Sequence, residues 1–200
     1  MVYGGKGLKM CGQFTIDTED SDSIYRIVMD ARQMYPDTYI QTGVIRPSNT
    51  VPVIAAVNNK IAPMPMLWGF PKWTGKGLVI NAKSETAAEK PMFRKSMETM
   101  RCVIPSTGFF EWTHDEQKIK YRFRLPNESL LYMAGIYEVV DGLPHFVVLT
   151  TVANASMQEV HDRMPVVLKP ELANGWIKDG TRVDLIINSA KTYALEAVRM

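Results

Sequence analysis

The sequence is poor in the residues that build covalent or metal-bound scaffolds. Its 200 residues include only two cysteines, Cys11 and Cys102, and three histidines. Two cysteines cannot form a disulfide framework or a four-cysteine metal site, and no pair of these residues has ligand spacing such as C-x2-C or H-x3-H. We therefore expect a fold held by its apolar core in a reducing cytoplasm, with no metal and no organic cofactor.

Long apolar runs and a strong excess of one charge are also missing. The longest apolar stretches, such as Val53 to Val57, fall far short of the roughly 20 residues that cross a bilayer. The first ten residues carry Lys6 and Lys9 but no apolar segment, so they do not resemble a signal peptide. A net charge of +2 does not by itself indicate a nucleic-acid binder, so any such surface depends on where basic residues gather. No membrane association is expected.

The rest of the composition is that of an ordinary globular domain, with 46% apolar and 22% charged residues. We expect one domain over residues 11–200, preceded by a leader or extension over residues 1–10 that is removed or not native. Short strands dominate and helices are scattered between them. This pattern predicts an α+β fold with a mainly antiparallel sheet system, strongly curved or open-barrel-like.

Three helices are indicated by apolar spacing and by capping residues. Ser21 precedes a helical pattern that stops at Pro36. A second helix should run to Met100 with a break at Pro91, and Thr86 with Glu89 has capping-box spacing. A late helix is expected over residues 170–178.

Strands are predicted mostly in the second half of the chain. Residues 130–140 and 145–152 should form a hairpin across Asp141-Gly142. Residues 64–73 contain two prolines and a glycine and should be irregular, whereas residues 182–187 read as the last strand. Further short strands are predicted over residues 11–17, 53–57, 78–81, 101–104, 108–113, 118–124 and 165–168.

A few polar residues stand where chemistry is possible. Cys11 can act as a nucleophile if a base or a positive neighbour favours its thiolate. His161 lies between a short helical turn and an apolar strand, either as a helix-terminal residue or as that base. His114 and His145 are read as solvent-facing turn residues.

Two further polar residues border apolar strands. Glu111 lies between Phe110 and Trp112, either as an outward carboxylate or as a desolvated acid or base. Asn81 closes an apolar run and by itself reads as a strand-end turn former.

Four ordered segments carry a more specific signal than any single residue. They are MCGQF at 10–14, INAKSET at 80–86, GFFEW at 108–112 and HDRMPVVL at 161–168. Together they resemble the SOS response-associated peptidase (SRAP) family, also known as abasic-site processing proteins, whose pattern reads MCGRF, NARxE(T), G(F/W)(F/Y)EW and H-x-RMP. The resemblance runs from Met10 to about Leu168 and implies an SRAP-like domain.

The resemblance implies a covalent reaction with damaged single-stranded DNA. In the family the cysteine is the mature N-terminal residue and links to abasic sites. Its α-amine, with a reference pKa near 7.7–8.0, attacks the sugar aldehyde, and the thiol then closes a thiazolidine ring. The implied partner is single-stranded DNA containing abasic sites. A monomer suffices for a self-contained pocket, in a bacterial-type cytoplasm and at the nucleoid when engaged on DNA.

The resemblance also assigns roles to residues of this sequence. Cys11 would be the nucleophile, Glu111 would move protons, His161 would assist opening of the sugar ring, and Asn81 would orient the amine or the sugar. DNA contacts would come from Lys83 and Arg163 to phosphates, from Trp68 and Trp73 by stacking unless they pack in the core, and from the Thr150 hydroxyl. The basic strand face at 118–124 either extends the positively charged surface that binds the DNA backbone or is simply exposed to solvent.

Three departures from the family pattern bear on these expectations. Ten residues precede Cys11, so either translation begins at Met10 or the chain removes its own leader. Gln13 replaces an arginine, and Lys83 replaces another, keeping the charge without bidentate geometry. DNA affinity could weaken without any change to the chemistry.

Two other functions stay open from the sequence. Under the family resemblance the chain is expected to be an abasic-site processing enzyme with a cysteine nucleophile, not a conventional multiple-turnover protease. Alternatively, it could be a thiol peptidase that acts on its own or other polypeptides with Cys11, Glu111 and His161. It could also be a non-catalytic single-stranded DNA module, whose binding would survive Cys11→Ala and never become covalent.

Overall fold

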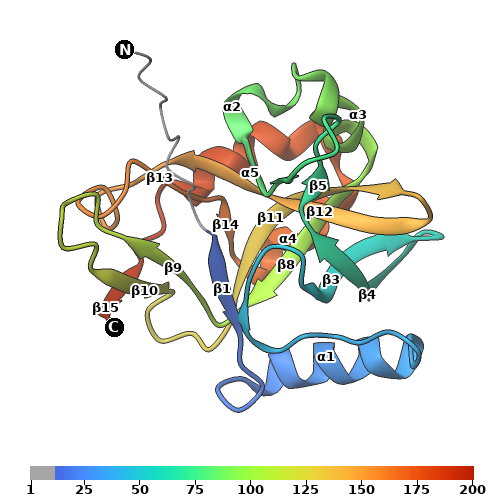
Figure 1. The fold of residues 1–200 in the computed structure, drawn as a ribbon, viewed down its shortest axis with the longest axis horizontal. Helices are drawn as coiled ribbons and strands as arrows, with labels where there is room; N and C mark the ends of the chain where they lie inside the picture. The colour runs from blue at the N-terminus through green and yellow to red at the C-terminus, as the bar shows by residue number, and fades with distance from the viewer. Residues whose placement is uncertain (1–11) are drawn as a thin grey trace.

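The computed structural model describes residues 12–200 (Figure 1). Its centre is a ring of five strands in the order β12, β4, β3, β8, β11 and back to β12. All neighbours pair antiparallel except β12 with β4. The ring confirms the predicted curved, barrel-like sheet. Its strands are β3 (Thr50–Val57), β4 (Lys60–Trp68), β8 (Arg101–Ser106), β11 (Leu131–Val140) and β12 (Leu143–Val152).

Three short strands extend this sheet. β14 pairs with β11, whereas β7 and β13 both pair with the end of β12. Their bounds are β7 (Asn81–Lys83), β13 (Arg163–Pro165) and β14 (Val167–Leu168).

A second, fully antiparallel sheet of five strands has the order β15, β10, β9, β1, β2. A separate small hairpin joins β5 and β6. The bounds are β1 (Gln13–Ile16), β2 (Gly43–Ile45), β5 (Phe70–Pro71), β6 (Leu78–Val79), β9 (Gly108–Trp112), β10 (Lys120–Arg124) and β15 (Glu196–Arg199).

Helices flank the sheets, with α1 along one end of the molecule (Figure 1). The Ser21 hydroxyl caps α1 by accepting a hydrogen bond from the Ile24 N–H at 3.3 Å, as the sequence predicts. No helix within residues 12–200 is long and apolar enough to cross a membrane. The helices are α1 (Asp22–Met34), α2 (Ser84–Ala87), α3 (Pro91–Thr99), α4 (Pro170–Lys178), the 3-10 turn η1 (Gly180–Arg182) and α5 (Val183–Ala190).

An aromatic cluster joins the two sheets through the core. Trp68 of β4 is fully buried, 4.9 Å from the Phe14 ring of β1 and 6.2 Å from the stacked Phe146 ring of β12. Its indole N–H donates to the Ile80 carbonyl oxygen at 3.0 Å, so both its apolar surface and its donor are satisfied inside the protein. Trp68 therefore packs in the core and has no exposed face on which a DNA base could stack.

Strand β4 contradicts the expected irregular segment at 64–73. Its prolines, Pro63 and Pro65, are two residues apart, so their missing N–H groups lie on the same side of the strand. Over most of its length β4 pairs only with β3, because β12 reaches it only at Leu67 and Trp68. The prolines therefore lie where the strand is an edge, and there they cost no ladder hydrogen bond.

Residues 182–187 were predicted as a strand, and this was wrong. Arg182 ends η1, and residues 183–187 begin α5, which buries Ile186, Ile187 and Ala190. That spacing, with Val183 one turn earlier, is helical rather than alternating.

Smaller differences concern helix and strand ends. Thr86 lies inside α2 and does not cap a helix, because α2 begins at Ser84. Strand β8 continues through Pro105 to Ser106. The break before α3 at Pro91 and the hairpin across Asp141-Gly142 are confirmed.

Candidate active site

The segments that carry the sequence signal converge at one end of the two sheets. Strand β1 begins at Gln13, which pairs with Phe110 of β9. Lys120 of β10 fixes this corner: its ammonium donates to the Gln13 amide oxygen at 3.2 Å and lies 3.8 Å above the Phe110 ring. Cys11 itself lies outside the described residues. The segment containing it is nevertheless joined to the GFFEW strand by backbone pairing that starts at Gln13.

Glu111 lies on the inward face of β9. Its side chain is only 2% exposed, and it shares a strand face with Phe109, whose ring stacks on Phe123 in the core. The interpretation of Glu111 as an outward-facing carboxylate is therefore wrong. A buried carboxyl group is a position where proton transfer can be tuned by the surroundings.

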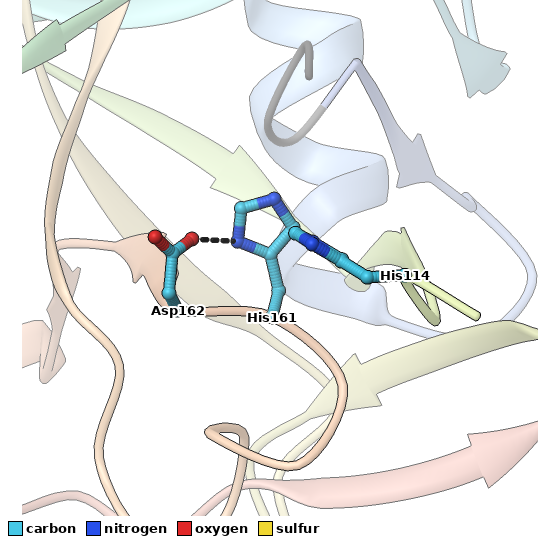
Figure 2. Close-up of side chains that lie close together, drawn as sticks. All are labelled: His114, His161 and Asp162. Atoms are coloured by element: carbon cyan, nitrogen blue, oxygen red, sulfur yellow. Dashed lines mark ion pairs between the residues drawn. The ribbon is translucent and has the colours of Figure 1, made fainter. Parts of the chain in front are cut away.

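His161 ends a tight turn that leads into β13, and it is also buried, with 6% exposure. The backbone N–H of His161 donates to the Met157 carbonyl oxygen at 3.0 Å, which fixes the backbone of this turn. His114, three residues after Glu111, contacts the His161 ring edge to face with centroids 4.4 Å apart (Figure 2). This contact joins the turn after the GFFEW strand to the HDRMP segment, and no sequence pattern indicates it.

The Nδ1 atom of His161 has two partners that suit different protonation states. It accepts a hydrogen bond from the backbone N–H of Arg163 at 3.0 Å. It also lies 2.9 Å from the Asp162 carboxylate, to which it can donate only when it is protonated. Burial lowers the pKa of His161, and His114 and Arg163 lower it further, while Asp162 opposes them. Nδ1 accepts from the Arg163 N–H when it carries no proton, and it donates to Asp162 when it does.

Arg163 connects β13 to the start of α2. Its guanidinium forms a two-point fork with the Glu85 carboxylate, at 2.8 and 2.7 Å, and also donates to the Thr150 carbonyl oxygen at 2.8 Å. The Thr151 hydroxyl adds a longer bond to Glu85 at 3.4 Å. Burial is the largest single effect and opposes ionisation of Glu85, but the hydrogen bonds and charge of Arg163, a backbone hydrogen bond and the Thr151 hydroxyl together outweigh it, so the Glu85 pKa is lowered. Glu85, which was not predicted as a site residue, therefore holds Arg163 in place.

The INAKSET segment is held against the same strand of the barrel. Asn81 pairs with Val148 and Lys83 with Thr150 in the parallel β7–β12 ladder. Asn81 is half-buried, and Lys83 is exposed just before α2. The Thr150 hydroxyl is fully buried, donates to the Ala82 carbonyl oxygen at 3.3 Å, and supports the Arg163 guanidinium rather than facing solvent.

Trp73 lies apart from this cluster, in the loop between β5 and β6. It is 96% exposed and lines a hollow of about 900 Å3 together with Lys72, Lys90 and Lys95. No residue of the His161, Arg163 and Glu85 cluster lines that hollow. Of the two tryptophans predicted as stacking surfaces, only Trp73 is placed where a base could reach it.

The basic face of β10 is largely compensated by carboxylates. Arg122 pairs with Asp20 at 3.2 Å, and Arg124 pairs with Glu196 at 2.8 Å. This arrangement favours the solvated-surface interpretation for these two arginines over a continuous electrostatic track.

Comparison with known proteins identifies the family of the chain. The family model "SOS response associated peptidase (SRAP)" matches residues 10–199. The abasic site processing protein YoqW of Bacillus subtilis is 34% identical, covering 84% of this chain and 80% of that protein, and YedK of Escherichia coli is 28% identical with the same coverage. A Bacteroides thetaiotaomicron structure with a TM-score of 0.75 and 23% identity covers 95% of this chain and 92% of its own. The chain therefore belongs to the SRAP family.

Proposed function

We propose that the protein processes abasic sites in single-stranded DNA by forming a covalent link through Cys11. The observation that carries the proposal is the convergence of the four sequence segments. Gln13 pairs with Phe110 beside Glu111, His114 of the next turn touches His161, and Arg163 binds Glu85. The names of YoqW and YedK as abasic site processing proteins support the abasic-site part of the proposal.

The proposed reaction uses both nucleophiles of an N-terminal cysteine. The opened abasic sugar presents an aldehyde, which the neutral α-amine attacks to give an imine with loss of one water. The thiol then adds across the C=N bond, so its proton passes to the nitrogen and a five-membered thiazolidine forms. An internal cysteine cannot follow this route, because its nitrogen is an amide. A free amine on Cys11 is thus the central requirement.

Three residues would assist this chemistry. Glu111, buried at the end of β9, would carry protons during loss of water and ring closure. His161 would help to open the sugar ring, since its Nδ1 has a partner both as acceptor and as donor. Asn81, half-buried beside β12, would orient the amine or the sugar through its amide.

DNA contacts would come from exposed side chains, one beside this centre and one in the separate hollow that Trp73 lines. Lys83, exposed before α2, would bind phosphate, and Trp73 would stack on a base beside three lysines. Arg163 is mostly buried against Glu85, with 13% of its side chain exposed. We therefore assign it the additional role of holding α2, and with it Lys83, against β13.

The α-amine of Cys11 must be released from the preceding residues. One route is translation from Met10 followed by removal of that methionine. The other is self-cleavage, in which the Cys11 thiol attacks the Met10 carbonyl carbon, forms a thioester with release of the Cys11 amine, and is freed by water. Both routes give the same N-terminus.

The test is an intact mass measurement after incubation with a single-stranded oligonucleotide bearing one abasic site. We expect a species that begins at Cys11 and carries the oligonucleotide less one water. The matched control is Cys11→Ala, which should bind without a denaturant-resistant adduct. A chain beginning at Met10 is measured in parallel with the full sequence. A protein that begins at Cys11 yet never gains this mass contradicts the proposal.

A further inference from the structure

The turn after β9 and the turn before β13 bring together three metal-binding side chains. His114 comes from the first turn, and His161 with Asp162 from the second (Figure 2). One ligand atom from each residue can be chosen so that all lie within 4.8 Å of one another. His114 and His161 are 47 positions apart, so local spacing rules could not detect the group.

We propose that His114, His161 and Asp162 form a binding site for a divalent metal ion of the zinc, nickel and cobalt class. Two imidazole nitrogens and a carboxylate oxygen suit these ions, whereas magnesium and calcium prefer oxygen ligands alone. A water molecule would complete a four-coordinate zinc.

The geometry allows the site to close with small movements. Ligand atoms of a tetrahedral zinc lie about 3.3 Å apart when its bonds are about 2.0–2.2 Å long. His161 is buried and fixed by its turn, so it acts as the anchor. His114 and Asp162 are exposed, Asp162 with 81% of its side chain, so side-chain rotation can bring their ligand atoms onto the ion.

Two further observations point to a ligand. The Nε2 atom of His161 is buried, and within residues 12–200 it has no hydrogen-bond partner. The local charge also tolerates a cation, because the nearby Arg163 guanidinium is already neutralised by its fork with Glu85. Asp115 beside His114 is held in its own turn by Thr113 and the Lys118 N–H, so it contributes negative potential without joining the ligand set.

A metal ion at this site should inhibit the covalent reaction. An ion bound to His161 occupies an imidazole nitrogen and fixes the ring, which can then no longer exchange a proton with the sugar. This consequence rests on the proposed function, whereas metal binding itself does not. The site is therefore a candidate for reversible, metal-dependent control of abasic-site capping.

Metal binding is tested first, without DNA. Calorimetry with Zn2+ and visible absorption with Co2+ are recorded in a Cys11→Ala background, so that the thiol cannot be a ligand. We expect one ion per chain, at least tenfold weaker binding in His114→Ala and in Asp162→Asn, and unaltered binding in His145→Ala. The control histidine bonds to the Gly69 carbonyl oxygen at another place in the fold. No binding at millimolar Zn2+, or equal binding by His114→Ala, overturns the proposal.

Inhibition is tested second, on the chain with Cys11 intact. Each variant's rate of adduct formation is compared with and without Zn2+, and the ratio is the readout. We expect Zn2+ to slow the protein at least tenfold, EDTA to restore it, and the ratio to approach one in His114→Ala. Equal inhibition of His114→Ala overturns metal control. If no adduct forms even without metal, the proposed function fails, whereas the metal site is still decided by the binding experiment alone.

Discussion

Truncation of Glu85 provides a quantitative test of how the site is held together. Glu85→Ala removes the fork that joins α2 to Arg163 of β13. Two short bonds from the guanidinium are lost, at 2.8 and 2.7 Å, together with the longer one from the Thr151 hydroxyl. The Nη2 atom keeps its bond to the Thr150 carbonyl oxygen, whereas Nη1 has no acceptor other than Glu85 among residues 12–200.

The cost follows from these contacts and from the exposure of the pair. Hydrogen bonds to charged groups contribute about 1.5–3 kcal/mol each. Water replaces part of this, because the Glu85 side chain is 38% exposed while that of Arg163 is only 13% exposed. We expect the free energy of unfolding to fall by about 2 kcal/mol, which lowers the Tm of a domain of this size by about 4–8 °C.

The surface pair Arg124–Glu196 is the matched control, because both partners are more than 40% exposed. Glu196→Ala should cost only about 0.2–1 kcal/mol in urea unfolding at neutral pH. Glu85→Ala should also slow adduct formation, since Lys83 and Arg163 lose their common support, whereas Glu196→Ala should not. Equal destabilisation by the two substitutions would refute the reasoning that burial of Arg163 sets the cost.

The same pair predicts a pH dependence. The Glu85 pKa in the folded protein is lowered from its ordinary value of 4.5, so the unfolded chain binds the proton more readily. The stabilisation is therefore complete above that ordinary value and is lost as the pH falls through the lowered pKa. The difference in unfolding free energy between the protein and Glu85→Ala should shrink below about pH 4.5. A difference that grows toward acid pH would contradict this assignment.

Four further substitutions separate chemistry, DNA binding and packing. Glu111→Gln should slow adduct formation by about 100-fold or more in single-turnover assays, with DNA affinity within twofold by fluorescence anisotropy; an unchanged rate would remove Glu111 from the mechanism. Trp73→Ala should weaken DNA binding by about 1–3 kcal/mol without changing Tm. Trp68→Ala should instead lower the free energy of unfolding by about 3–5 kcal/mol. A stability loss in Trp73→Ala with none in Trp68→Ala would contradict the exposed position of Trp73 and the buried position of Trp68. Gly135→Ala should cost about 1–3 kcal/mol in urea unfolding, because the new Cβ would lie 2.9 Å from the Val147 carbonyl oxygen; unaltered stability would show that the barrel yields there.

Local features of the fold were predictable because their causes are local. The Ser21 cap, the break at Pro91 and the Asp141-Gly142 turn each depend on residues within one turn of the chain. The closure of the barrel does not, since it requires β12 to pair with β4 and β11 at once. Strand β4 was missed for a similar reason: proline excludes a central strand, and only the sheet order shows that this part of β4 is an edge.

The family pattern covers part of the candidate site. That pattern supplies Asn81, Glu111 and His161, and Glu85 lies within one of its segments without having been assigned a role. His114 is different, because nothing in THDEQ distinguishes it from any polar turn. Its contact with His161 arises only from the meeting of two turns on different sheets, so it could be found only in three dimensions.

Strand β12 explains why core and site should respond together. Its residues His145 and Phe146 pair with β4 inside the barrel, and four positions after Phe146, Thr150 lies between β7 on one side and β13 on the other. The Glu85–Arg163 fork spans these two flanking segments, so a shift of β12 would move Lys83 and the turn carrying His161 at the same time. Phe146 of β12 also stacks on Trp68 in the core, so β12 contacts both the aromatic core and the site. Core substitutions near Trp68 should thus reduce adduct formation even though none of them touches DNA.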